Sequence, residues 1–286
     1  MEHWKRELGL GMRRLARSPG FSLTVVFVLG LGLAAATTIF SAVHGVLLAD
    51  LPYGEPEQLV TLLRSTPRGQ FGAFAPAELG DFRQGVGAFR EVSGVGQLAV
   101  TLTGDGEPAR LPAASVSANL FETLGVPPLL GRGFETRAGK VEDLRQVVIS
   151  FGLWQSRFGG EADILGRTLE VDGEPHRVSA VMPPGFEYPE GARLWLPGER
   201  DIPRLPQPFP GDLEQIRNIN YYSMIARLKD RDLLEAAAGQ LEAVAFELRE
   251  EFPEEYRETR FQLRPLKEQM VGNAGLQLWI LFGAVG

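Results

Sequence analysis

Residue types that could perform chemistry are few in this chain, and they lie far apart. The three histidines, His3, His44 and His176, fall in different regions of the sequence and do not form the closely spaced group that a metal site needs. A nucleophile–histidine triad would have to use His176, which follows Pro175 in a predicted hairpin strand. We expect His176 to be an ordinary surface residue. The sequence therefore indicates no catalytic, cofactor-binding or metal-binding residue.

One segment is similar to a phosphate-binding loop but does not meet its requirements. Gly133 to Lys140 reads GFETRAGK, in which the two glycines lie one residue too far apart. Val141 also stands where the loop needs Ser or Thr to reach the magnesium ion. We therefore expect no nucleotide binding by this chain. Its carboxylates give no better signal, because those between Glu242 and Glu251 lie on the solvated face of a predicted helix.

Composition excludes further classes of function. The chain has 286 residues, no cysteine and a net charge of −7. Without cysteine there are no disulfides, thiol nucleophiles or thiolate metal sites. The first 20 residues are basic, so the remainder is more acidic than the whole. A domain of that charge has no electrostatic reason to bind nucleic acid.

A long apolar segment organises the chain. Phe21 to Ala49 contains no Asp, Glu, Lys or Arg, and a bilayer core about 30 Å thick needs roughly 20 apolar residues in a helix. A buried helix of a soluble protein would be shorter and would carry a polar face. A signal peptide would have an apolar region of about 7–15 residues and a cleavage site. The pattern predicts an uncleaved transmembrane helix over residues 21–48.

The residues before this helix predict its direction. Lys5, Arg6 and the cluster at Arg13, Arg14 and Arg17 outweigh two glutamates, and positive residues stay on the cytoplasmic side. We expect a cytoplasmic N-terminus and an outer domain after the helix.

The same segment has helical periodicity. Trp4, Leu8, Met12 and Leu15 fall on one face of a helix, so residues 1–20 are predicted to form an amphipathic basic helix on the inner membrane surface.

The C-terminal end is apolar as well. No charge follows Glu268, and Leu276 to Gly286 resembles the first half of a second span. We expect residues 271–286 to begin a second transmembrane helix, and the sequence to be a fragment that ends inside it.

The region between these two segments has the pattern of an α+β domain. Strand–helix–strand patterns occur at both of its ends, and hairpin-rich and proline-rich sequence lies between them. Eight of the 20 prolines fall between Met182 and Gly211, where we expect irregular extended structure around an apolar anchor at Leu194–Leu196. The predicted strands are 59–64, 95–103, 109–116, 146–150, two within 167–181, 221–228 and 261–266, and the predicted helices are 76–90, 117–124, 151–158 and 233–252.

Several strings in this order carry a family resemblance. They are RRLARSPGFSL, GLAAATTIFSAVHGVLLADLPYGEPEQLV, SANLFETLGVPPLLGRGF, VVISFGLWQSRFGGEADILGRTLEVDGEPHRVSAVMPPGFEYP and the MIARL strand before a long helix. Together they resemble a MacB-like periplasmic core domain that follows the first transmembrane helix of an FtsX-like ABC-transporter permease.

The resemblance implies an architecture. The core domain, residues 49–270, would have porter-like strand–helix–strand units and a smaller inserted β-rich subdomain at about 117–212. It would be periplasmic or extracellular, anchored in the cell inner (plasma) membrane by the N-terminal helix.

It also implies a function and partners. The chain would be a permease subunit whose outer domain transmits ATP-driven motion for export or transenvelope signalling. It would not itself be an enzyme, because ATP hydrolysis belongs to a separate cytoplasmic ABC ATPase subunit. The lipid bilayer, a second permease copy and a periplasmic adaptor would be further partners, with no nucleic acid and no cofactor.

The chain departs from that family in two ways, and alternatives stay open. No ATPase domain precedes the first span, and the later membrane helices of the family are absent from this sequence. A membrane-anchored periplasmic binding or sensing module without transport activity is one alternative, and a membrane-anchored enzyme is another. Pro52 and Pro56 stiffen the short connection after the first span, so we expect shifts of the span to move the outer domain directly.

Overall fold

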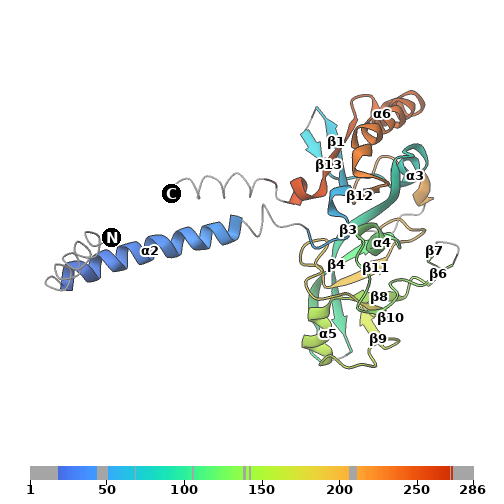
Figure 1. Ribbon diagram of the computed structural model, residues 1–286. Helices are drawn as coiled ribbons and strands as arrows, with labels where there is room; N and C mark the ends of the chain where they lie inside the picture. Colours follow the sequence, from blue (N-terminus) through green and yellow to red (C-terminus); the bar gives the residue numbers. More distant parts are fainter. Residues whose placement is uncertain are drawn as a thin grey trace. The chain divides into compact units, whose positions relative to one another are not determined.

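The computed structural model describes residues 19–43, 51–67, 69–104, 106–137, 140–141, 143–205, 211–270 and 272 (Figure 1). Contacts divide the chain into two units. One comprises Met1–Asp50 with Met270–Gly286, and the other comprises Leu51–Gln269, which we call the core domain.

The first unit contains the helix α2, Pro19–Val43. Its proline stands in the first turn, where the missing N–H costs no hydrogen bond. Hydroxyls of Thr24, Thr37 and Thr38 donate to the carbonyls four residues earlier, so these polar groups are satisfied within the helix. Among the described residues, no helix combines the length and hydropathy needed to cross a membrane. The expected basic helix at 1–20, His44 and the predicted second span lie outside the described residues, apart from isolated positions.

The core domain alternates strands with a few helices. Its described helices are η2 (Pro56–Gln58), α3 (Pro76–Gly85), α4 (Leu120–Leu124), α5 (Phe151–Phe158), η3 (Leu213–Gln215), η4 (Arg231–Leu233), α6 (Leu234–Glu251) and α7 (Pro253–Tyr256). Its described strands are β1 (Leu59–Thr66), β2 (Gly69–Phe71), β3 (Phe89–Thr103), β4 (Ala109–Val116), β5 (Leu130–Gly131), β6 (Thr136–Arg137), β7 (Lys140–Val141), β8 (Gln146–Ile149), β9 (Thr168–Val171), β10 (Glu174–Val181), β11 (Leu194–Pro197), β12 (Ser223–Leu228) and β13 (Arg260–Pro265).

Two strand–helix–strand units interlock at one end of the sheet. β1–α3–β3 and β12–α6–β13 are such units, and the strand order there is β13-β1-β12-β3 with antiparallel neighbours. Each unit therefore has a strand of the other inserted between its own two strands. Figure 1 shows α3 and α6 side by side at this end of the core domain.

The rest of the domain continues the same sheet. β3 is 15 residues long and pairs with β12 over its first part and with β4 over its second. β4 then pairs with β11 in parallel, and β8, β10 and β5 follow, so eleven of the described strands form one mixed sheet, whereas β6 and β7 pair only with each other. The region predicted as an inserted subdomain, residues 117–212, is thus joined by backbone hydrogen bonds to the strands that lie outside it in the sequence.

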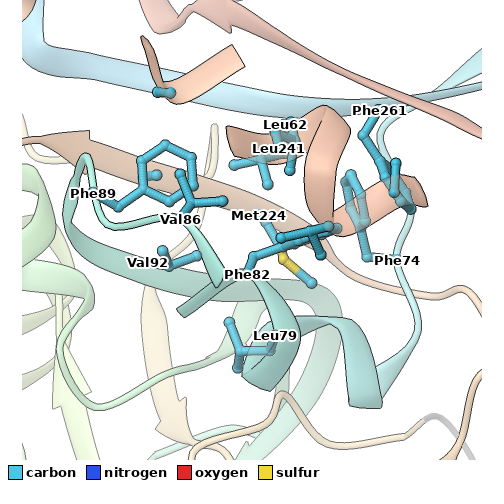
Figure 2. Packing of buried hydrophobic residues seen from close by; sticks show 14 of the residues in the cluster. Leu62, Phe74, Leu79, Phe82, Val86, Phe89, Val92, Met224, Leu241 and Phe261 are labelled. Carbon is cyan, nitrogen blue, oxygen red and sulfur yellow. The ribbon is translucent and has the colours of Figure 1, made fainter. Parts of the chain in front are cut away.

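α3 and α6 pack on one face of the sheet around a hydrophobic core. Phe74, Phe82 and Phe261 form its aromatic centre, with the Phe82 and Phe261 ring centroids 5.0 Å apart. Figure 2 shows these rings beside Met224 of β12 and Leu241 of α6. The burial of these apolar side chains accounts for most of the stability that the helices gain here.

A buried ion pair lies at the edge of this core. Arg64 of β1 pairs with Glu78 of α3, and both are almost fully buried. Glu78 also accepts a hydrogen bond of 2.8 Å from the Ala75 N–H, which stabilises the first turn of α3. Burial raises the pKa of the Glu78 carboxyl to about 7, although Arg64 and the Ala75 N–H lower it.

The sequence predicted most of these elements. The hairpins β3–β4 and β9–β10, the strands β1, β8, β12 and β13, and the helices α5 and α6 are confirmed within a few residues.

Three sequence predictions need correction. α3 ends at Gly85 rather than at 90, because the glycines there weaken a helix, and Phe89 begins β3. α4 begins at Leu120 rather than at 117, because the Ser117 hydroxyl accepts from the Gly94 N–H and donates to the Asp201 carbonyl instead of capping the helix. The proline-rich segment contains a buried sheet strand, β11, because its prolines flank the apolar residues rather than interrupt them.

The contact between α3 and α6 yields a matched pair of substitutions. A Cβ at Gly85 would overlap Val244 of α6, whereas a Cβ at Gly80 would meet nothing within 4 Å. Gly85→Ala should therefore lower the free energy of unfolding by about 1–3 kcal/mol. Gly80→Ala should raise it by up to about 1 kcal/mol, because alanine favours the helix. Urea unfolding of both variants measures this, and equal effects would contradict the packing described.

The raised pKa of Glu78 predicts how stability changes with pH. The folded state holds the carboxyl proton more tightly than the unfolded chain, whose pKa is near 4.5. The resulting stabilisation is present below about pH 4.5 and is lost as the pH rises through about 7. At about 1.4 kcal/mol per pKa unit, the loss is on the order of 3 kcal/mol.

Glu78→Gln should remove this dependence, so its unfolding free energy relative to wild type should rise between pH 4.5 and 8. The exposed Glu247→Gln serves as the control and should follow the wild-type curve. If Glu78→Gln ran parallel to wild type over this range, the assignment of the titration to Glu78 would be wrong.

Candidate functional site

The expected surface position of His176 is wrong. Its side chain is only 2% exposed, and Nδ1 lies 3.0 Å from the Glu174 carbonyl oxygen. The histidine lies on β10 opposite Leu169 of β9, and the next residue, Arg177, also pairs with Gln146 of β8. Its Nε2 has no hydrogen-bond partner among the described residues.

The other chemical candidates form no site that the structure brings together. Within the described ranges, no group of three or more His, Asp or Glu side chains could hold a metal ion. His3 and His44 lie outside those ranges, as do residues 138 and 139 of the Gly133–Lys140 segment.

The most closely built arrangement involves the segment that leads into β1. Residues 51–58, which we call the connector, end in the short helix η2. Tyr53 of the connector is buried, and its ring meets Phe186 and Tyr188 edge-on with centroids 6.4 and 6.1 Å away. Burial raises the pKa of the Tyr53 hydroxyl to about 12.

Arg227 of β12 binds this connector to α4. It is 3% exposed, and its guanidinium donates to the Thr123 carbonyl at 2.8 Å and to the Gly54 carbonyl at 2.5 Å. It also donates to the Glu55 carbonyl at 3.3 Å. Burial lowers the pKa of Arg227 while the Glu55 carboxylate opposes this, and an arginine stays charged under all ordinary conditions. One buried cation thus bridges carbonyls of two chain segments.

The geometry of the sheet places Arg227 there. Side chains alternate between the two faces of a strand, so Met224, Ala226 and Leu228 enter the core beneath α3 and α6. Ile225 packs into a second core on the opposite face, and Arg227 shares that side. Leu59, the first residue of β1, is the cross-strand partner of Arg227.

Two glycines allow the connector to approach α4 closely. The Gly54 N–H donates to the Leu124 carbonyl at 3.0 Å, and a Cβ at Gly54 would lie 2.9 Å from the Gly125 carbonyl oxygen. Gly125 has a φ of +65°, which ends α4 in the left-handed conformation. Arg227 and Gly54 therefore satisfy terminal carbonyls that a five-residue helix cannot satisfy by itself.

The two ends of the core domain emerge side by side. β1 pairs with β13 in antiparallel register, with Val60 opposite Pro265. The connector enters at this point, and the chain leaves β13 at Leu266, which is buried in the same core as Leu59 and Tyr53. The segments on either side of the domain therefore attach to one end of the same strand pair.

A cavity of about 780 Å³ also borders α4. Phe121, Glu122 and Gly125 from α4 and its cap contribute to the wall, together with Phe134 from the segment that follows. The volume lies within the range of small-molecule sites, about 300–1,000 Å³.

An ion pair on the cavity wall links α3 to the segments around it. Arg83 of α3 pairs with Asp201 at 2.7 Å, and the other carboxylate oxygen of Asp201 accepts from the Ala118 N–H at 2.5 Å. Asp201 itself has a φ of +68°, an unfavourable conformation for a residue other than glycine. Charged groups therefore hold segments of the cavity wall to one another.

This arrangement fixes the connector, α4 and the segments around the cavity relative to one another. Sequence reasoning did not single out Arg227. The signal for it was a lone charge in the string SMIARL, where the remaining residues predict burial on both faces of the strand. A charge in that position must be buried with partners.

Comparisons with known proteins agree with this architecture. A family model described as the MacB-like periplasmic core domain matches residues 22–244. A search of curated protein sequences found no significant match.

Solved structures share the fold. The periplasmic region of MacB from Actinobacillus actinomycetemcomitans superposes with a TM-score of 0.55 at 13% identity, covering 79% of this chain and 97% of that one. A domain described as part of a permease from Porphyromonas gingivalis gives a TM-score of 0.53 at 14% identity, covering 75% and 92%. The family model matches well over half of the chain, including α2, the connector and most of the core domain. The chain therefore belongs to the MacB-like periplasmic core domain family.

Proposed function

We propose that this chain is part of a permease subunit of an ABC transporter, and that its core domain transmits ATP-driven motion outside the membrane. The observation that carries the proposal is the family match, which starts at residue 22 within α2 and continues through the core domain to residue 244 in α6. A single model thus includes both the apolar segment and the domain that follows it.

Membrane anchoring through the first apolar segment is part of this proposal. Residues 21–48 carry no Asp, Glu, Lys or Arg, and the basic residues before them favour a cytoplasmic N-terminus. The hydroxyls of Thr24, Thr37 and Thr38 bond within the helix, as polar groups in a bilayer must. The core domain would then be periplasmic or extracellular, and residues 271–286 would begin a second span.

The paired ends of the core domain support a mechanical role. Since β1 and β13 lie together, two membrane helices joined to them would act on one edge of the sheet. The sheet continues by hydrogen bonds from this edge to β5. Energy would come from a separate cytoplasmic ABC ATPase, with a second permease copy and a periplasmic adaptor as further partners.

A second function has one observation in its favour. The cavity beside α4 has the size of a ligand site, as a membrane-anchored binding or sensing module without transport activity would need. Both functions share the same anchoring and the same orientation, so the ATPase partner distinguishes them.

The topology is testable because the chain has no cysteine of its own. A single cysteine at the exposed Glu107 should react with an impermeant thiol reagent in intact cells, and one at Glu2 should react only after permeabilisation. The reason is the positive charge before α2, which retains the N-terminus in the cytoplasm. Labelling of Glu2→Cys but not Glu107→Cys in intact cells would refute the orientation.

The absence of a phosphate loop yields a biochemical prediction. The purified chain should neither bind nor hydrolyse ATP, and hydrolysis should appear when a cytoplasmic ABC ATPase is added. Phosphate release with and without that subunit measures this. Turnover by the chain alone that is lost on substitution of one of its own residues would show that the proposal of a separate ATPase is incorrect.

A further inference from the structure

Arg227 joins the connector to the wall of the cavity. On one side its guanidinium holds the carbonyls of Gly54 and Glu55, and on the other it holds the carbonyl of Thr123 in α4. The Gly54 N–H adds a direct bond to the Leu124 carbonyl. The connector and the C-terminal end of α4 are thereby fixed to each other through a group that is shielded from water.

α4 and the turn after it also form part of the cavity wall. Phe121 and Glu122 line it from the helix, and Gly125 and Val126 line it from the turn that follows. A shift of α4 by one or two ångströms would therefore change the shape of the cavity, because packed interiors transmit displacement rather than absorb it.

α4 is also held by contacts that do not involve the connector. The Thr123 hydroxyl lies 2.7 Å from the Ser93 hydroxyl, and Asn119 donates to Glu91, so the helix also contacts β3. These bonds join neutral groups or a partly exposed carboxylate. The Arg227 bonds come from a buried charge and are the stronger ones.

The connector is also strained at this point. Glu55 has a φ of +44°, in the left-handed region that residues other than glycine adopt at a cost of about 1 kcal/mol or more. That conformation directs the Gly54 and Glu55 carbonyls toward one guanidinium. Any buried arginine needs hydrogen-bond partners. Arg227 takes its partners from both a strained connector and a helix end, and burial alone does not require that combination.

We propose that Arg227 is a positioning residue that couples the connector to α4, so that displacement of the connector reshapes the cavity. The inference rests on the proposed function, because only that function makes the connector the part that moves. Its test uses neither transport nor ATP. Failure of the permease assignment would appear in the cysteine labelling and ATPase measurements and would leave this test unaffected.

The coupling is measured first by hydrogen exchange on the full chain in detergent. Arg227→Met should make the amides of Gly54, Gly125 and Val126 exchange about tenfold faster, because the bonds from the charged donor are lost. Amides of α6 should keep their rates. The control Arg231→Met removes an arginine whose side chain is 70% exposed and should change none of these amides.

Two outcomes of that experiment would overturn the proposal. Unchanged exchange in the connector and α4 would mean that Arg227 does not hold them. Equal acceleration throughout the core domain would mean that Arg227 merely stabilises the fold. Arg227→Lys should give intermediate rates, since lysine keeps the charge but loses the planar set of donors.

The second experiment reads the cavity directly. Glu122→Cys introduces a reporter on the cavity wall into a chain without other thiols. Gly54→Ala places a methyl group against Gly125 and should displace the connector, which should alter the labelling rate at position 122 while Arg227 is present. In the Arg227→Met background the same change should have a smaller effect, so the two substitutions should be non-additive. If Gly54→Ala left the labelling rate unchanged, or if the effects of Gly54→Ala and Arg227→Met were strictly additive, the coupling would be refuted.

Discussion

β1 forms hydrogen bonds to β12 on one side and to β13 on the other, and the architecture of the core domain depends on this position. Because β1 follows the connector and β13 ends the domain, its pairing brings both ends of the domain to one place. The two strand–helix–strand units cannot separate without breaking these ladders. The same strand places Leu59 and Leu62 in cores on opposite faces of the sheet.

Each face of the sheet also holds a buried arginine here, Arg64 from β1 and Arg227 from β12. On the helix-covered face Arg64 pairs with Glu78, and on the other face Arg227 binds backbone carbonyls. Buried charges cost free energy unless they are paired, so each fixes the geometry of its surroundings more tightly than apolar packing does. Arg64 and Glu78 fix the start of α3, whereas Arg227 fixes the connector and the end of α4.

The sequence predicted the local elements because their signals are local. The Asp172–Gly173 hairpin has φ values of +52° and +81°, as a two-residue turn between such strands requires. β11 was missed because proline density is a local argument against a strand, whereas the strand exists through its neighbours β4 and β8. His176 was misplaced for a similar reason: the hairpin signal predicts its partner strand β9, but not the parallel pairing of the rest of β10 with β8. The lone charge in SMIARL indicates that Arg227 is buried with partners, but those partners could not be predicted, because they are backbone carbonyls, which carry no sequence signature.

We propose that motion of the two membrane-spanning segments reaches the core domain through the connector, which Arg227 holds. The most direct measurement adds ATP to the complete permease with its ATPase and records the labelling rate of a single cysteine on the cavity wall. We expect an ATP-dependent change that disappears when about ten Gly/Ser residues are inserted after Asp50, since a flexible chain decouples its ends. The same insertion after the exposed Gly106 should leave that change intact. An ATP-dependent change that persists with the insertion after Asp50 would contradict transmission through the connector.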